Sequence, residues 1–281
     1  MPTFETPEPI SARIDVAVGA VRIRAGDNAV TTVEVEPTDA SSDEDRRAAQ
    51  LTRVEYRRGQ LLVRAPKLRS WLSRGAGGSV DVRIELPAGS NVQGDAGLTD
   101  FECEGRLGEC RIKTGLGHVR LEWADTVRLR TGIGDIGVDR VTGHAEITAG
   151  SGEVRARRLE ATAVIKSSNG DTWIGEAGGE LRVSAANGDI AVDVSKAGVV
   201  AKSANGDVRL GEVARGSVVL ETALGDLEVG IREGTAAWLD VCAAAGRVHN
   251  ALQAAEAPET AAETVEVRAR TSAGDVLIRR P

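Results

Sequence analysis

Aromatic residues are scarce in this sequence. Phe, Trp and Tyr make up 2% of its 281 residues, and the hydrophobic fraction of 41% consists mostly of Val, Ala, Leu and Ile. A compact globular core usually contains bulky aromatic side chains, whereas the narrow interior of a solenoid needs small and β-branched ones. The composition therefore favours a narrow β-solenoid, and the 33 glycines suit the many turns of such a fold.

The sequence also lacks the features of exported, membrane and nucleic-acid-binding proteins. Its first residues carry neither the basic nor the apolar segment of a signal peptide, and no run approaches the roughly 18 apolar residues of a membrane span. Three cysteines are too few for a disulfide scaffold. A net charge of −7 argues against general nucleic-acid binding, which depends on cations that neutralise phosphates. We therefore expect a cytoplasmic protein that binds no nucleic acid.

An internal repeat dominates the sequence. The phrase Asn-Gly-Asp occurs at 169–171, 187–189 and 205–207, with a step of 18 residues each time. A fixed period near 20 residues is typical of a solenoid. With the Gly of this phrase as the reference, the equivalent positions are Thr99, Gly117, Gly134, Gly152, Gly170, Gly188, Gly206, Gly225, Gly246 and Gly274.

Hydrophobic side chains alternate on both sides of each reference position, which predicts strands with one buried face. Apolar residues form columns two and four positions after the reference and five positions before it. We expect these three columns to face a core. The column two positions after the reference contains Phe101, Val119, Ile136, Val154, Thr172, Ile190, Val208 and Leu227.

Asn-Gly between alternating strands is also a strong hairpin signal, which would make the chain an antiparallel meander. In other copies the residue before Gly is Leu116, Ile133 or Leu224. The usual hairpin turn needs a positive φ at this residue, which β-branched Ile resists. A single-layer meander would also leave its apolar face uncovered, whereas a coil of parallel strands closes on its own interior. We therefore predict an all-β fold, a right-handed parallel β-helix (solenoid) with rungs of about 18 residues.

The chain before the regular array predicts a cap of strands and one helix. Residues 10–23 resemble a first rung, and residues 41–51 begin with a capping-box pattern that predicts a short helix. A hairpin is expected at 54–64 and a further strand at 80–86. The expected organisation is an N-terminal region at 1–89, a repeat array at 90–281 and, inside the array, an inserted loop at about 251–264.

Several phrases resemble a known family. They are the repeats Thr131-Gly-Ile-Gly-Asp-Ile136 and Asn205-Gly-Asp-Val208, the strand at 80–86, and the phrases at 106–110 and 171–176. Together they resemble the bacterial β-strand-repeat family of unknown function whose members are described as candidate adhesins. The resemblance covers the whole chain. It implies a β-helical fold and no established activity, cofactor or catalytic residue.

An acidic column directly follows the reference positions. It could form a ridge that binds divalent cations or sugars, because hard cations favour carboxylate oxygens. Alternatively, Asp suits the turn and stays solvated, with Lys113, Arg130, Lys166 and Lys202 as neutralising neighbours. We favour the second interpretation and expect no metal site. The column contains Asp100, Asp135, Glu153, Asp171, Asp189, Asp207, Asp226 and Asp275.

Two tryptophans are candidates for a partner or ligand surface. Trp71 stands between Arg69 and Arg74 on a basic, glycine-rich segment and could contact a partner, or it could fold back over the coil. Trp173 takes an outward position beside Asp171. The weak candidate surface therefore consists of Trp71, Arg69, Arg74, Asp171, Trp173, Asp189 and Asp207.

No catalytic constellation is evident. Cys103 and Cys110 fall on inward columns and are expected to be small buried hydrophobes, and the three histidines lie in different columns. We predict a non-enzymatic scaffold or interaction module without a cofactor, whose protein or carbohydrate partner is unknown. The alternative is a β-helix that binds or degrades polysaccharides through its outward acidic and basic columns.

Overall fold

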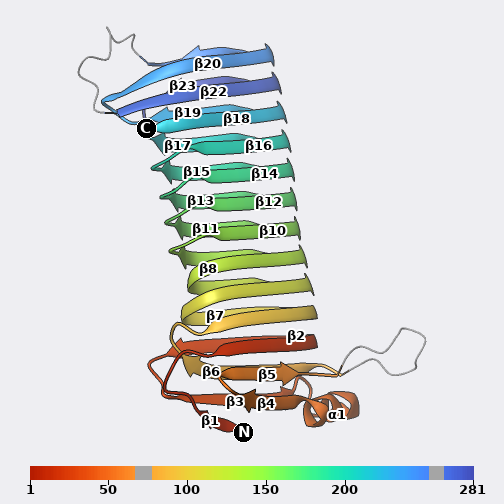
Figure 1. The fold of residues 1–281 in the computed structure, drawn as a ribbon. Coiled ribbons are helices and arrows are strands. Elements are labelled where there is room, and N and C mark those ends of the chain that lie inside the picture. Colours follow the sequence, from red (N-terminus) through yellow and green to blue (C-terminus); the bar gives the residue numbers. More distant parts are fainter. Residues whose placement is uncertain (67–77, 253–262) are drawn as a thin grey trace. The chain divides into compact units, whose positions relative to one another are not determined.

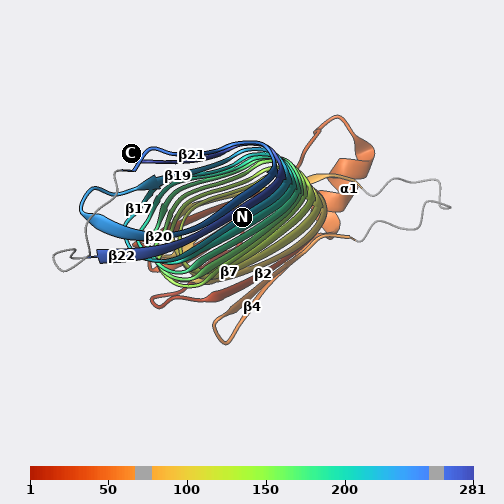
Figure 2. The same cartoon turned by 90° about the horizontal axis from the view of Figure 1, so that it is seen from above.

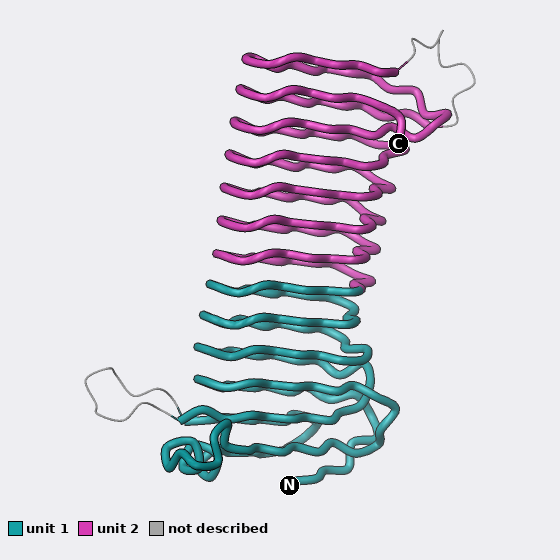
Figure 3. The backbone as a smooth tube through the Cα atoms, turned by 180° about the vertical axis from the view of Figure 1, so that it is seen from behind, with its two compact units in different colours: residues 1–139 teal, residues 140–281 magenta. Residues whose placement is uncertain are grey.

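The computed structural model describes residues 1–66, 78–252 and 263–281. The chain divides into two compact units, unit 1 at residues 1–139 and unit 2 at residues 140–281 (Figure 3). Both units consist almost entirely of strands. Trp71, Arg69 and Arg74 of the predicted partner surface lie outside the described residues, as does most of the predicted insertion.

Unit 1 begins with a cap and continues into long strands that each run through a corner (Figure 1). Its elements are β1 (Thr3–Glu5), β2 (Ser11–Gly26), β3 (Val30–Pro37), α1 (Asp43–Leu51), β4 (Arg53–Arg57), β5 (Gln60–Arg64), β6 (Val80–Pro87), β7 (Asn91–Leu116), β8 (Val119–Ile133) and β9 (Ile136–Val141), which contains the unit boundary.

Unit 2 has shorter strands, two in each turn of the coil. They are β10 (Ala145–Ser151), β11 (Val154–Leu159), β12 (Ala163–Asn169), β13 (Thr172–Ala177), β14 (Leu181–Asn187), β15 (Ile190–Ser195), β16 (Val199–Asn205), β17 (Val208–Val213), β18 (Gly216–Leu224), β19 (Leu227–Ile231), β20 (Thr235–Ala245), β21 (Val248–Asn250), β22 (Glu263–Ala273) and β23 (Val276–Arg279).

Strands one period apart pair in parallel. In unit 2, β12 pairs with β10 and β14, so that Ile165 lies beside Val183, 18 residues later. The second strand of each turn does the same, because β13 pairs with β11 and β15. The turns therefore stack into two parallel sheets (Figure 2). This arrangement confirms the predicted parallel β-helix, and the described strands of the repeat array do not form the antiparallel meander.

The core lies between these two sheets. The predicted inward columns are buried: Val183, Ile190 and Val192 are each at most 2% exposed. The column two positions after the reference is buried throughout, from Phe101 to Leu227. Small and β-branched side chains therefore fill a narrow interior, which explains the low aromatic content.

Glycine makes the corner between the two strands of a turn. Gly188 has a φ of +125°, and a Cβ there would lie 2.4 Å from the carbonyl oxygen of Gly170 in the neighbouring turn. Only glycine combines this φ with such a close approach of two backbones. Among the described non-glycine residues, only Arg58 has a positive φ, so Asn187 does not form the turn of a hairpin.

The N-terminal cap follows the predicted elements. β4 and β5 form the expected hairpin, and α1 begins two residues later than predicted, with Ser42 as its N-cap. The rung formed by β2 is not the outermost one. It pairs with β7 on one side and with β5 and β6 on the other, and β3 and β4 then cover β6 and β5 as antiparallel strands.

Unit 2 ends with a similar exchange of order. β22 pairs with both β18 and β20, and β23 pairs with both β19 and β21. The rung formed by β22 and β23, which is the last in the sequence, therefore lies between the β18–β19 rung and the β20–β21 rung. The regular step predicted the rungs themselves, but the spatial order at both ends differs from the chain order.

Candidate functional site

The acidic column forms a hydrogen-bonded ladder along unit 2. Asp189 donates its backbone N–H to Oδ1 of Asp171 at 2.9 Å, and Asp207 donates to Oδ1 of Asp189 at 2.8 Å. The same contact joins Asp207 to Asp226 and Asp226 to Asp275, at 2.7 Å each. Each carboxylate thus accepts a backbone N–H from the next turn at the glycine corner. The Asp side chains have a structural role that goes beyond solvation at a turn.

The ladder also accommodates the two residues that interrupt the acidic column. Arg247 donates its backbone N–H to Oδ1 of Asp275 at 2.8 Å, which follows the spatial and not the sequence order of the rungs. This backbone hydrogen bond is the main reason why the pKa of Asp275 is lowered, and the guanidinium of Arg247 lowers it further. In unit 1, the backbone N–H of His118 donates to Oδ1 of Asp100 at 2.8 Å, and the ring Nδ1 of His118 accepts the backbone N–H of Asp135 at 3.1 Å.

The predicted basic neighbours do not neutralise this ladder through direct contacts. The Lys202 ammonium lies 2.6 Å from Glu221, and no ion pair joins Lys113 or Arg130 to an acidic-column residue within the described ranges. Nor do the described residues contain any group of three or more His, Cys, Asp or Glu side chains arranged to hold a metal ion.

Trp173 lies against the outer face of its own sheet. Its indole Nε1 donates to Oδ1 of Asp193 at 3.3 Å, and its ring lies close to Gly175. The side chain is half-buried. The indole is thus tied to the neighbouring rung and is not a free aromatic platform beside Asp171.

The other polar candidates are internal to the fold. Asn205 donates its amide to Asn187 at 2.8 Å, and Asn187 donates to Asn169 at 2.9 Å, in an exposed amide ladder beside the acidic one. Cys103 and Cys110 are buried, as predicted. A hydrogen bond from Cys103 and burial raise the pKa of the Cys110 thiol well above its usual value, which keeps this thiol protonated.

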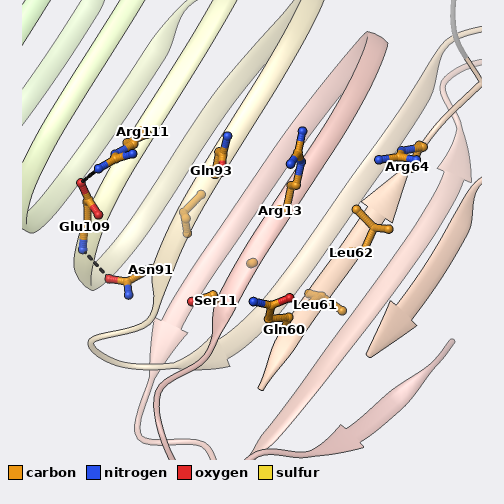
Figure 4. A pocket seen from close by; sticks show the side chains of 12 residues that line it. Ser11, Arg13, Gln60, Leu61, Leu62, Arg64, Asn91, Gln93, Glu109 and Arg111 are labelled. Carbon is orange, nitrogen blue, oxygen red and sulfur yellow. Dashed lines mark hydrogen bonds and ion pairs between the residues drawn. The ribbon is translucent and has the colours of Figure 1, made fainter. Parts of the chain in front are cut away.

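A shallow depression lies on the outer face of β5, β2 and β7 in unit 1 (Figure 4). It has a volume of about 450 Å³. Three guanidinium groups line it, with side chains 48–55% exposed. Arg64 contacts Asp15 at 3.2 Å, and Arg111 contacts Glu109 at 2.6 Å. The uncharged lining side chains include Gln60, Gln93, Asn91 and Ser11.

Further cations extend this depression along the coil. Arg128 lies beside Arg111 in the register of β7 and β8, and Arg130 lies beside Lys113. Neighbouring strands are about 4.8 Å apart, so each pair places two like charges on adjacent rungs. All four side chains are exposed. We call this surface the basic face, and it consists of Arg13, Arg64, Arg111, Lys113, Arg128 and Arg130.

Sequence reasoning did not identify the basic face. The sequence pattern placed Lys113 and Arg130 only as neighbours that neutralise the acidic column on the other side of the corner. The relevant signal is an alignment of the outward positions from rung to rung, in which Arg13, Arg111 and Arg128 share one column. Arg13 could be added to that column only once the rung formed by β2 was known to lie directly beside β7.

No helix in the described ranges is long and apolar enough to cross a membrane. No curated protein matches the chain. A candidate adhesin from Bacteroides fragilis is 10% identical, with 100% of this chain and 95% of that chain covered and a TM-score of 0.36. A candidate adhesin from Parabacteroides distasonis is 12% identical, with 98% and 95% covered and a TM-score of 0.38.

A candidate cell adhesion protein from Clostridium sporogenes is 11% identical, with 100% of this chain and 98% of that chain covered and a TM-score of 0.24. Similarity at this level carries no functional inference. The family comparison is more specific, because the model of the Toastrack DUF4097 family matches residues 12–279. That match spans the rungs of both units and agrees with the resemblance found in the repeats. The chain therefore belongs to the Toastrack DUF4097 family.

Proposed function

We propose that the chain is a non-enzymatic interaction module whose basic face binds an anionic partner. The observation that supports this function is the register of β7 and β8, which places Lys113 beside Arg130 on adjacent rungs. Like charges at rung spacing repel each other, and a bound anion relieves that repulsion. No acidic side chain forms an ion pair with Lys113 or Arg130 in the described part of the chain, so both cations are available to a ligand.

The state of the acidic column supports a non-enzymatic role. A hydrolase needs a carboxylate pair that is free to transfer a proton or attack a substrate. Asp171, Asp189 and Asp207 instead each accept a backbone N–H from the next rung. A polysaccharide-degrading function, the alternative from the sequence, would have to use Oδ2 of carboxylates whose Oδ1 already supports the backbone. Of that alternative we therefore retain polysaccharide binding and not polysaccharide degradation.

The lining of the depression favours an acidic polysaccharide as the partner. Arginine binds carboxylate and sulfate groups in a bidentate manner. The amides of Gln60, Gln93 and Asn91 between the arginines can hydrogen-bond to sugar hydroxyls. Cations along successive rungs form a linear array, which suits an extended polymer with regularly spaced charges.

The test is a titration of the full chain with polygalacturonate at low and at high salt. The double variant Lys113→Gln/Arg130→Gln removes two charges from the basic face. Loss of two exposed charge contacts, each contributing about 0.5–1 kcal/mol, should weaken binding about tenfold. Salt should weaken binding of the unmodified chain as well.

The matched control is Arg120→Gln/Arg157→Gln, which makes the same change in net charge at two exposed arginines on strand segments that follow the glycine corner. We expect this control to bind within about twofold of the unmodified chain, since neither arginine lines the depression or belongs to the basic face. Equal loss in both variants would show that only net charge matters and would contradict the proposal. New reducing ends during the titration would contradict the non-enzymatic role.

A further inference from the structure

The β20–β21 rung ends the coil of unit 2 with one open edge. Among the described residues, β20 pairs only with β22, and β21 pairs only with β23. The N–H and C=O groups on the other edge of the 11-residue strand β20 therefore have no strand partner in that part of the chain. An unpaired edge of this length can accept another strand.

The hydrophobic core is uncovered at the same edge. Val248 is 47% exposed, whereas Val276, its register partner in the next rung, is fully buried. Val241 is half-buried, although its partner Ala269 is fully buried. The side chains of β20 that face inward thus continue the core columns, but one side of them remains in contact with solvent.

The terminal rung of unit 1, in contrast, has no open edge of this kind among the described strands, because other strands cover it. There β4 covers β5, and β3 covers β6, as antiparallel strands. Inward residues of that rung are fully buried, as Val63 and Ile84 show with at most 1% exposure. β4 also carries charges at three of its five positions, Arg53, Glu55 and Arg57, which discourage further strand addition.

β20 has none of the usual protection against strand addition. Its sequence, Thr-Ala-Ala-Trp-Leu-Asp-Val-Cys-Ala-Ala-Ala, contains no Lys, no Pro and one charged residue. That residue, Asp240, is already paired with Arg270 of the adjacent strand at 3.0 Å. Trp238 on the outer face is 58% exposed. Low charge, small side chains and an exposed tryptophan are typical of an edge that is covered by a partner strand.

We propose that the open edge of β20 binds the same edge of a second copy of this chain, as an antiparallel strand pair. A two-fold axis at Val241 gives a register without opposed like charges. Asp240 then lies opposite Cys242 of the second copy, and Trp238 lies opposite the small Ala244. On the inner face, Leu239 lies opposite Ala243, so that the two cores join.

The size of this end face agrees with a reversible dimer. The eleven residues of β20 span about 36 Å. The two sheets of the coil are each about 10 Å thick, so the end face measures at most about 700 Å² per copy. A standard interface buries about 800 Å² per partner. An antiparallel edge pair also needs no second kind of surface, because the same strand provides donors and acceptors to itself. An interface of this size between two free copies is expected to form and dissociate reversibly over micromolar protein concentrations.

Sedimentation of the full chain between about 1 and 100 µM tests this interface. We expect the mass to rise from 29.4 kDa towards twice that value. Val241→Lys places a charge on the inner face at the edge and should raise the dissociation constant at least about tenfold. The matched control is Leu224→Lys, which adds the same charge at an aliphatic corner residue that is 57% exposed. This control should dimerise like the unmodified chain.

Cys242 provides an independent readout that does not depend on a folding-sensitive variant. It is the exposed cysteine, whereas Cys103 and Cys110 are buried. In the proposed register the two copies of Cys242 are diagonal neighbours, about 7–8 Å apart. A short bis-maleimide should therefore yield a covalent dimer, and Cys242→Ser should abolish it.

Amide hydrogen exchange separates the second copy from other occupants of the edge. Exchange of the β20 amides should slow as protein concentration rises. Protection that is already complete in dilute monomer would show that another part of the same chain covers the edge, which overturns the proposal. A chain that stays monomeric, or a dimer that neither Val241→Lys nor Cys242 cross-linking detects, also overturns it.

Discussion

Oδ1 of Asp171 accepts the backbone N–H of Asp189 from the next turn at 2.9 Å. This contact recurs from turn to turn beside the glycine corner, where the N–H would otherwise point to solvent without a protein partner. It converts an outward column of like charges into a support for the backbone. The Asn-Gly-Asp phrase is therefore best understood as a structural unit, in which Gly makes the corner and Asp anchors it.

The first prediction separates hydrogen bonding from charge at Asp189. Asp189→Ala removes the acceptor for Asp207 N–H and should lower the free energy of unfolding by about 1 kcal/mol. Asp189→Asn keeps an oxygen at the same position and removes one charge from a row of like charges, so its stability should equal that of the unmodified chain. Urea unfolding of both variants measures the difference. Equal losses for Ala and Asn would mean that charge, and not the hydrogen bond, is important.

The second prediction concerns calcium. One oxygen of each of Asp171, Asp189 and Asp207 is engaged by a backbone N–H, so we expect no rise in melting temperature with millimolar calcium. The triple Asn variant should give the same melting curve with and without calcium. A calcium-dependent rise that the triple variant lacks would identify a cation site, since a ligand stabilises the state that binds it.

The repeat could be predicted because its determinants are local. Gly188 is required by its φ and by its contact with Gly170, and Val192 is required by burial. Each recurs at a fixed step and is visible without knowledge of any distant contact. The helix at α1 was predicted for the same reason, because Ser42 caps it from within the same segment.

The exchange of rungs at the ends could not be predicted in this way. Val267 and Leu239 occupy equivalent positions of two rungs, and either could stack on Val218 with the same burial pattern. The apolar pattern of the rungs therefore does not distinguish the two orders. The basic face was missed for a related reason, since it brings Arg13 next to a strand that begins at Asn91.

The third prediction tests the corner. Gly188→Ala would place a Cβ 2.4 Å from the Gly170 carbonyl oxygen and force an alanine to φ +125°. We expect a loss of about 3 kcal/mol or more. Gly137→Ala is the control, because its φ is ordinary and its Cβ would meet only a side-chain carbon at 4.0 Å. Thermal unfolding should show a large shift for the first variant and little for the second.

The fourth prediction concerns thiol reactivity. The hydrogen bond with Cys103, followed by burial, raises the pKa of Cys110, and only the thiolate reacts quickly with a disulfide reagent. Cys242 is exposed. Ellman's reagent should therefore modify one thiol per native chain and all three in denaturant. Rapid modification of more than one thiol in the native chain would contradict the burial of the pair.

The last prediction is that the stability of the chain falls at acidic pH and that Glu176 in unit 2 contributes to this loss. A hydrogen bond from Lys196 lowers the pKa of Glu176, and the charges of Lys196 and Arg158 lower it further, against a smaller opposing effect of burial. The folded state therefore binds this proton less readily than the unfolded state does. The stabilisation is present above the unfolded pKa and is lost as pH falls through the lowered folded pKa.

Stability against urea should thus decline below about pH 4.5, and Glu176→Gln should weaken the pH dependence in that range. Above that range Glu176→Gln should be less stable than the unmodified chain, because it loses its ion pairs with Lys196 and Arg158. Glu180→Gln is the matched control, since it removes an exposed carboxyl that has no ion pair among the described residues. If stability falls with pH in the same way in Glu176→Gln as in the unmodified chain, the contacts of Glu176 with Arg158 and Lys196 do not contribute to folding stability.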